Sequence, residues 1–170
     1  MSSLGKEWRG RIHPVHETTQ DAPGVIAFPP FIYGIPWLVG LGVHALIPAR
    51  VLAPGPARAA GIVLTAVGIA LAGWGRWAMH RVGTDPNPTK PSTALALGGP
   101  FRFTRNPLYL SLTLFYIGLT LLVNTLWPLV LLPAVLIVVQ RGVIEREERY
   151  LLRKFGADYV AYLTRVRRWL

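Results

Sequence analysis

Cysteine is absent from this 170-residue sequence, and acidic residues are scarce. Without cysteine the chain has no disulfide framework, no thiolate nucleophile and no thiolate metal site. The four histidines, at positions 13, 16, 44 and 80, are scattered, and none pairs with a carboxylate at a metal-ligand spacing. We therefore expect no metal centre in this protein.

Charge is sparse as well. Charged residues make up only 15% of the chain, whereas hydrophobic residues make up 52% and the mean hydropathy is +0.39. This composition is too apolar and too poorly charged for an ordinary soluble domain, and it predicts a membrane protein.

Uncharged runs are long enough to cross a bilayer, whose hydrocarbon layer of roughly 30 Å takes about 20 helical residues. One such run is Ala27–Leu46. A second is Ala59–Gly75, where the flanking Arg58 and Arg76 have side chains long enough to snorkel outward.

The longest uncharged run, Asn106–Gln140, covers 35 residues. Asn124, Thr125 and Pro128 interrupt it near its middle, so it predicts a helical hairpin of two short spans. The expected fold is therefore all-α: an integral membrane helical bundle of about four transmembrane helices, with a helical C-terminal region outside the membrane.

The basic residues indicate how the chain is oriented. Of the 18 Lys and Arg residues, 16 lie before the first span, around the central loop (Arg76 to Arg105) or from Arg141 onwards. By the positive-inside rule, both termini and the central loop are cytoplasmic. Topology then explains the net charge of +10, which argues against a nucleic-acid partner. The expected division is a cytoplasmic N-terminal segment (1–26), two transmembrane helices (27–80), a cytoplasmic loop (81–106), a transmembrane hairpin (107–144) and a cytoplasmic helical region (145–170).

A polar stretch directly precedes the hairpin, in the sequence GPFRFTRNPLYL (99–110). Charge next to lipid is costly, so we interpret these residues as one half of a pocket at the membrane surface. Closing the hairpin at its middle brings Arg105 level with Ile144. The loop over 81–100 is long for a simple connector and is typical of a lid or a binding loop.

The other half of the pocket is expected in RGVIEREERYLLRKFGADYVAYLTRVRRWL (141–170), which continues the hairpin as a helix. Glu148 falls on the apolar face formed by Ile144 and Leu151, where a carboxylate needs a partner or a function. Arginines and carboxylates at one membrane face, with an apolar cavity behind them, suit a zwitterionic, amino-acid-like ligand. S-adenosylmethionine is such a ligand, although the spacing alone does not separate it from other zwitterions.

These two stretches together resemble the C-terminal signature of the isoprenylcysteine carboxyl methyltransferase and phospholipid methyltransferase superfamily, over about residues 84–170. In that superfamily the first motif reads Arg-His-Pro-x-Tyr, and the second is Glu-Glu followed by Phe-Gly-x-x-Tyr-x-x-Tyr. The resemblance implies a membrane methyltransferase that uses S-adenosylmethionine and releases S-adenosylhomocysteine. It places the two cofactor motifs in the 81–106 loop and the 145–170 region. The cofactor-binding residues it implies are Gly99, Pro100, Arg105, Asn106, Pro107, Tyr109, Glu147, Glu148, Phe155, Tyr159 and Tyr162.

Roles follow from this resemblance and from side-chain chemistry. Arg105, or else Arg141, is expected to bind a carboxylate of the cofactor or of the acceptor. Glu148, with Glu147, is expected to hold the cofactor's ammonium group. The candidates for the catalytic step are Arg105, Arg141 and Tyr109.

Asn106 stands where the superfamily motif has histidine, so this position offers no general base near neutral pH. A carboxylate acceptor is already ionised and needs no base, whereas an amine must first lose a proton. We therefore expect a lipophilic acceptor that carries a carboxylate, like an isoprenylcysteine, or a thiol. Phospholipid N-methylation is one alternative, and a non-catalytic membrane scaffold or a transporter is another.

The expected partners are the lipid bilayer and a lipophilic acceptor, in the cell membrane of a bacterium or an archaeon. The oligomeric state is open. Three C-terminal arginines are expected to bind anionic lipid headgroups rather than to take part in catalysis: Arg165, Arg167 and Arg168.

Overall fold

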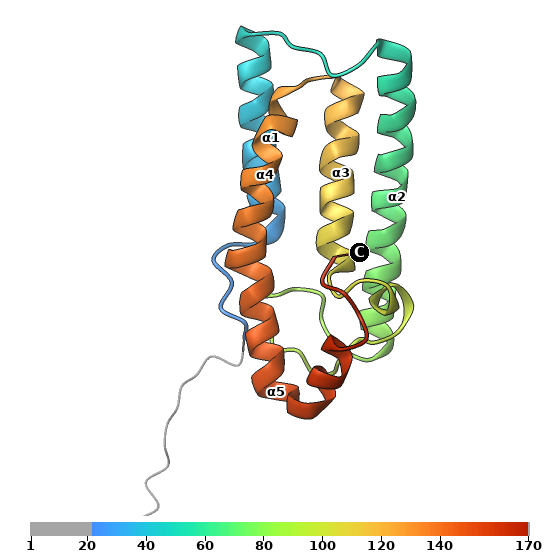
Figure 1. Cartoon of the computed structure of the whole chain (residues 1–170), viewed down its shortest axis with the longest axis vertical. Coiled ribbons are helices and arrows are strands. Elements are labelled where there is room, and N and C mark those ends of the chain that lie inside the picture. The colour runs from blue at the N-terminus through green and yellow to red at the C-terminus, as the bar shows by residue number, and fades with distance from the viewer. Residues whose placement is uncertain (1–21, 170) are drawn as a thin grey trace, which may run out of the picture.

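The structure, a computed structural model, describes residues 22–169, and this part of the chain is helical without any β-strand (Figure 1). The predicted all-α fold is confirmed. Predictions that fall on residues 1–21 lie outside the described part. The elements are α1 (Pro29–Leu46), α2 (Pro54–Arg81), the short 3₁₀ helix η1 (Gly99–Arg102), α3 (Pro107–Val123), α4 (Trp127–Val139), the π-helical turn η2 (Gln140–Ile144) and α5 (Glu145–Leu163).

Proline begins each of the four apolar helices. Pro29, Pro54, Pro107 and Pro128 occupy the first or second position of α1, α2, α3 and α4. The first helical N–H groups have no partner within the helix, and the fixed φ of proline already suits the helix. Proline therefore sets these helix starts, and none of the four has a side-chain cap.

Three helices of the described part are long and apolar enough to cross a membrane, namely α1, α2 and the continuous helix from Trp127 to Leu163. The fourth apolar helix, α3, has 17 residues, so its length is about 26 Å. Figure 1 shows these helices running side by side.

Helices α2 and α3 pack closely because glycines recur along α2 at Gly61, Gly68 and Gly75. A Cβ atom at Gly61 would lie only 2.8 Å from the backbone nitrogen of Leu122 on α3. Small residues at such spacing let two helix backbones approach in a membrane, where packing rather than hydrophobicity drives association.

The hairpin turn forms where the sequence predicts it. Asn124 ends α3 in the left-handed conformation, with φ of 55°. Its side-chain oxygen accepts hydrogen bonds from the backbone N–H groups of Val51 (3.1 Å) and Leu52 (3.2 Å). The turn is thereby tied to the α1–α2 loop, and both lie at the end of the bundle opposite α5 (Figure 1).

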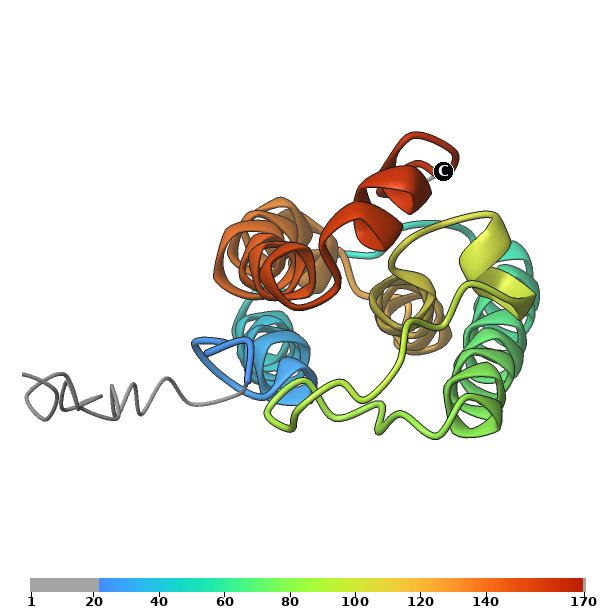
Figure 2. The ribbon, with the colours of Figure 1, turned by 90° about the horizontal axis from the view of Figure 1, so that it is seen from below.

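The two helices of the hairpin pack mainly against other helices, α3 against α2 and α4 against α1. Buried tyrosines join the two pairs: the Tyr116 hydroxyl donates to the Pro128 carbonyl at 2.8 Å, and the Tyr33 hydroxyl lies 2.9 Å from Thr113 Oγ1. Figure 2 shows the 82–98 loop running from the end of α2 across to α1 and back to η1.

Two irregularities shape the last helix. The π-helical turn η2 joins α4 to α5, and Gly142 within it leaves room for the Ile26 side chain. Gly156 has φ 50° and ψ −121°, which kinks α5. A backbone with these angles is open to glycine and strained for other residues. The kink directs the last residues back towards the start of α3 (Figures 1 and 2).

Candidate active site

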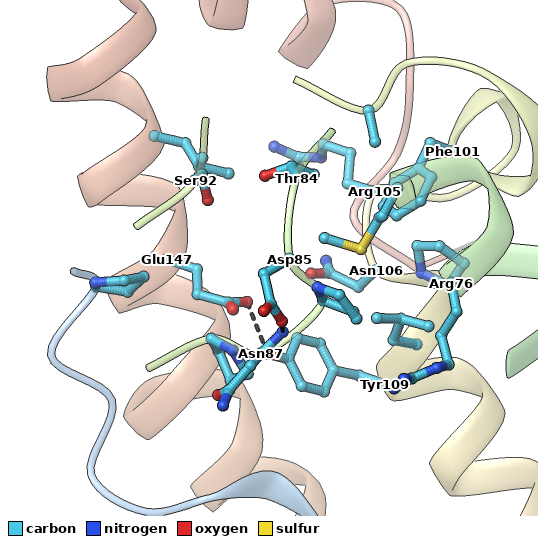
Figure 3. A pocket seen from close by; sticks show the side chains of 18 of the residues that line it. Arg76, Thr84, Asp85, Asn87, Ser92, Phe101, Arg105, Asn106, Tyr109 and Glu147 are labelled. Carbon is cyan, nitrogen blue, oxygen red and sulfur yellow. Dashed lines mark hydrogen bonds between the residues drawn. The ribbon is translucent and has the colours of Figure 1, made fainter. Parts of the chain in front are cut away.

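A cavity of about 260 Å³ lies at the end of the bundle where α5 and the 82–98 loop meet. Its wall combines the start of α1, the last turns of α2, the loop, the start of α3 and the face of α5 that carries Glu147 and Glu148. Figure 3 shows side chains from these segments surrounding one space. The two motifs that are far apart in the sequence therefore meet, as predicted.

The first motif is held by the C-terminal segment. The Arg105 N–H donates to the Arg167 carbonyl at 2.9 Å. The Arg168 carbonyl accepts from the Asn106 side-chain amide at 2.9 Å and from the Thr104 hydroxyl at 3.1 Å. Asn106, which replaces the superfamily histidine, thus serves as a tether for the end of the chain.

An ion cluster lies beside this tether. Arg105 is 3.2 Å from Glu148, and their side chains are only 15% and 13% exposed. Arg168 binds the same carboxylate through Nε at 3.0 Å and through Nη2 at 2.5 Å. Two guanidinium groups share one carboxylate, so the cluster keeps a net positive charge.

The other acidic side chain of the second motif has a different environment. Glu147 accepts a hydrogen bond from the Tyr109 hydroxyl at 2.8 Å, drawn as the dashed line in Figure 3. Burial raises the pKa of Glu147 to about 7, although this hydrogen bond acts in the opposite direction. Near neutral pH this carboxyl group therefore exchanges between its neutral and its charged form.

The kink at Gly156 directs two tyrosines into the wall of the cavity. Tyr159 and Tyr162 are both buried, and the Tyr162 hydroxyl donates to the Phe101 carbonyl at 2.7 Å. Burial raises the pKa of both phenols above its ordinary value, so both are neutral at pH 7. They close the cavity on the α5 side.

The 82–98 loop forms another part of the wall and is not a simple connector. Asp85 binds Lys90 at 2.6 Å and accepts from the Asn87 N–H at 2.8 Å, so the loop folds on itself. The Ser92 N–H donates to the Tyr150 hydroxyl of α5 at 3.0 Å. The loop is thereby attached to the helix that carries both acidic side chains.

The structure brings together most of the residues that the sequence singled out. The predicted residues that line the cavity are Arg105, Asn106, Pro107, Tyr109, Glu147, Glu148, Tyr159 and Tyr162.

Four predicted residues lie elsewhere. Arg141 is exposed on η2 and does not reach the cavity. Pro100 is buried in η1 next to Gly99, and Phe155 lines a separate groove beside Asp158. The π-helical turn that contains Arg141 changes the helical register of this segment.

The side chain of Arg105, which the hairpin register places level with Ile144, reaches one helical turn further and binds Glu148. One further prediction needs correction. Arg168 does not stand free for lipid headgroups, because it binds Glu148. A C-terminal arginine folded back on the chain leaves no periodic signal in the sequence, which is why it escaped prediction.

Sequence reasoning also missed Arg76, Asp85 and the start of α1, all of which line the cavity. The recurrence of Ala72, Arg76 and Met79 at helical spacing was a signal for one shared face of α2.

Residues 56–158 match the family of phospholipid methyltransferases, which is more than half of the chain. The chain belongs to this family. Phospholipid methyltransferases are part of the superfamily to which the two motifs pointed, and this resemblance is confirmed. Membership in this family makes the protein a membrane methyltransferase, and members of the family generally use S-adenosylmethionine. No similar curated protein and no similar solved structure was found.

Proposed function

We propose that this phospholipid methyltransferase family member transfers the methyl group of S-adenosylmethionine to a lipophilic acceptor at the cytoplasmic face of the membrane. One observation carries the proposal: a carboxyl group, Glu147, and a guanidinium, Arg105, line the same largely apolar cavity. An amino-acid-like ligand needs one group of each kind for its two charged ends.

The side chains present fit the amino-acid part of this cofactor. Arg105 Nε is buried and has no hydrogen-bond partner among the described residues, so it is a donor available to a carboxylate. Glu147 uses only Oε2 for Tyr109, which leaves Oε1 for an ammonium group. Glu147 suits this role better than Glu148, whose charge two arginines already neutralise.

S-adenosylmethionine, when bound, supplies an electrophilic methyl group on a positively charged sulfur. The protein residues would bind and orient the cofactor and shield it from water. Tyr109, Tyr159 and Tyr162 exclude water from the cavity, and the Arg105–Glu148–Arg168 cluster holds Arg105 in place. Positioning of this kind accounts for a large share of catalysis when no covalent intermediate is needed.

We propose a carboxylate or a thiolate as the acceptor group, because Asn106 cannot take a proton and neither of these anions has to lose one. A phospholipid amine is the second candidate. In that case Glu147, whose pKa is about 7, would take the amine's proton and would not hold the cofactor's ammonium group. The cytoplasmic orientation is supported by the positive-inside rule, because 16 of the 18 Lys and Arg residues lie before the first span, around the central loop or from Arg141 onwards in the sequence. We propose no nucleic-acid partner.

Calorimetric titration of the full chain in neutral detergent with S-adenosylmethionine and S-adenosylhomocysteine tests the cofactor assignment. We expect saturable binding that is weakened at least tenfold by Glu147→Gln and by Arg105→Ala. Glu145→Gln and Arg149→Ala, on the same helix but off the cavity, are matched controls. Absence of binding by folded wild-type protein would contradict the methyltransferase proposal and favour a non-catalytic scaffold or a transporter.

A second experiment separates the acceptor classes. Purified protein is incubated with cofactor labelled in its methyl group and with one acceptor at a time: a prenylated cysteine, a long-chain thiol or phosphatidylethanolamine. Label in the first two products supports the carboxylate or thiol proposal, and base-stable label in the phospholipid alone supports N-methylation.

A further inference from the structure

Arg76, an exposed residue next to the second apolar run, lies on the cavity face of α2. Ala72, Arg76 and Met79 all line the cavity, and their spacing of four and three residues puts them on one face of the helix. Figure 3 shows Arg76 among the side chains that surround this space, in the same region as Tyr109.

Arg76 is the charged group of the cavity that lacks a partner. Among the residues that the structure describes, Arg105 is paired with Glu148, Asp85 with Lys90, and Glu147 with Tyr109. Arg76 forms neither an ion pair nor a hydrogen bond within residues 22–169.

Arg76 lies near the end of α2 and lines the cavity. It lies five residues before Arg81, the last residue of α2, which is a rise of about 7.5 Å. Across the cavity the wall is formed by the start of α1, with Phe28, Pro29 and Pro30. Helices α1 and α2 make few direct contacts, because α1 packs on α4 and α2 on α3, and the 82–98 loop runs between their ends (Figure 2).

We propose that Arg76 binds the anionic group, a carboxylate or a phosphate, of the lipophilic acceptor. This inference rests on the proposed function, and it specifies that the acceptor is an anion and that Arg76 binds its charged group. The aliphatic part of the acceptor would contact apolar side chains of the same wall, among them Met79, Leu108 and Leu112. A guanidinium suits either anion because it donates two parallel hydrogen bonds.

Arg81 provides a matched control at the same end of the same helix. Its guanidinium lies 4.9 Å from the centre of the Trp77 ring, and it does not line the cavity. An arginine that only anchors α2 at the interface would act like Arg81, so the two residues separate ligand binding from general surface charge.

Equilibrium binding of labelled single-chain lipids to the full-length protein in neutral detergent tests the proposal at pH 8. The probes are palmitate, lysophosphatidic acid and, as the uncharged reference, palmityl alcohol. Arg76→Ala is expected to weaken binding of an anionic probe about tenfold, to leave the alcohol unchanged, and to be partly restored in Arg76→Lys. If Arg76→Ala weakens the binding of palmitate alone, the acceptor carries a carboxylate. If it weakens the binding of lysophosphatidic acid alone, the acceptor carries a phosphate.

Two results would overturn the inference: unchanged binding of both anionic lipids by Arg76→Ala, or equal losses in Arg76→Ala and Arg81→Ala. Thermal unfolding in detergent on the same samples shows whether Arg76→Ala is folded. If wild-type protein fails to bind S-adenosylhomocysteine, the proposed function fails, while the comparison of Arg76 with Arg81 still decides where the anion binds.

Discussion

Cofactor affinity is expected to depend on pH through Glu147. Only the ionised carboxylate attracts an ammonium group, and burial raises the pKa of this carboxyl to about 7. With that pKa, about 3% of the protein carries the charge at pH 5.5 and about 75% at pH 7.5. The dissociation constant for S-adenosylhomocysteine should therefore fall about 25-fold over this range.

The direction of the effect follows from the raised pKa. An unperturbed glutamate, which titrates near pH 4.3, would already be charged at pH 5.5 and would give an almost flat profile. In the empty protein the same shift makes the fold less stable as pH rises from about 4.5 towards 7, because the unfolded chain releases this proton first. Binding of a cation offsets that cost.

Isothermal titration in detergent at steps of half a pH unit measures this profile. Glu147→Gln should bind more weakly at pH 7.5 and lose the slope, while Glu145→Gln should keep the wild-type profile. A flat wild-type profile, or the same slope in Glu147→Gln, would refute the assignment of the ammonium group to this residue.

Three further changes test the fold that supports the site, each followed by thermal unfolding in detergent. Gly61→Ala should lower the free energy of unfolding by about 1–3 kcal/mol, because its Cβ would meet the α3 backbone at 2.8 Å. Gly73→Ala, also within α2 but with no atom within 4 Å, should not lower Tm. Gly156→Ala should lower the free energy of unfolding by about 1–2 kcal/mol, because alanine is strained at the backbone angles of this residue. It should also weaken cofactor binding, and an affinity equal to that of the wild-type protein would contradict the role of the kink. Glu148→Gln leaves two guanidinium groups without a counter-charge and should cost roughly 2 kcal/mol, less than for a fully buried pair because the Arg168 side chain is 34% exposed. An unchanged Tm in Glu148→Gln would show that the cluster is not stabilising.

The pocket itself was predictable in outline. Two polar stretches on either side of a 35-residue uncharged run must meet when that run folds back at Asn124, and Arg105, Tyr109 and Glu148 were identified on this basis. The exact partners were not predictable. Side chains of this length reach a full helical turn, so the register of the hairpin does not decide which carboxylate meets which guanidinium.

The division of labour between the two acidic residues of the second motif also depends on the fold. In the sequence Glu147 and Glu148 are adjacent, and Glu148 was the preferred ligand for an ammonium group because it falls on the apolar face of the helix. In the structure Glu148 forms ion pairs with Arg105 and Arg168, whereas Glu147 accepts a hydrogen bond from a neutral tyrosine, Tyr109. Its pKa near 7 arises from burial, which no local pattern encodes.

The sequence by itself determined the helical membrane fold, because uncharged runs, prolines at helix starts and a break at Asn124 act locally on the backbone. It also determined the family, through motifs whose residues are close together in the chain. Only the tertiary structure decided which charges neutralise each other and which stay available, because Arg168 folds back onto Glu148 and Arg76 lines the cavity without a partner among the described residues. Ion pairing and burial depend on distances between segments, and those distances are set when the whole bundle packs.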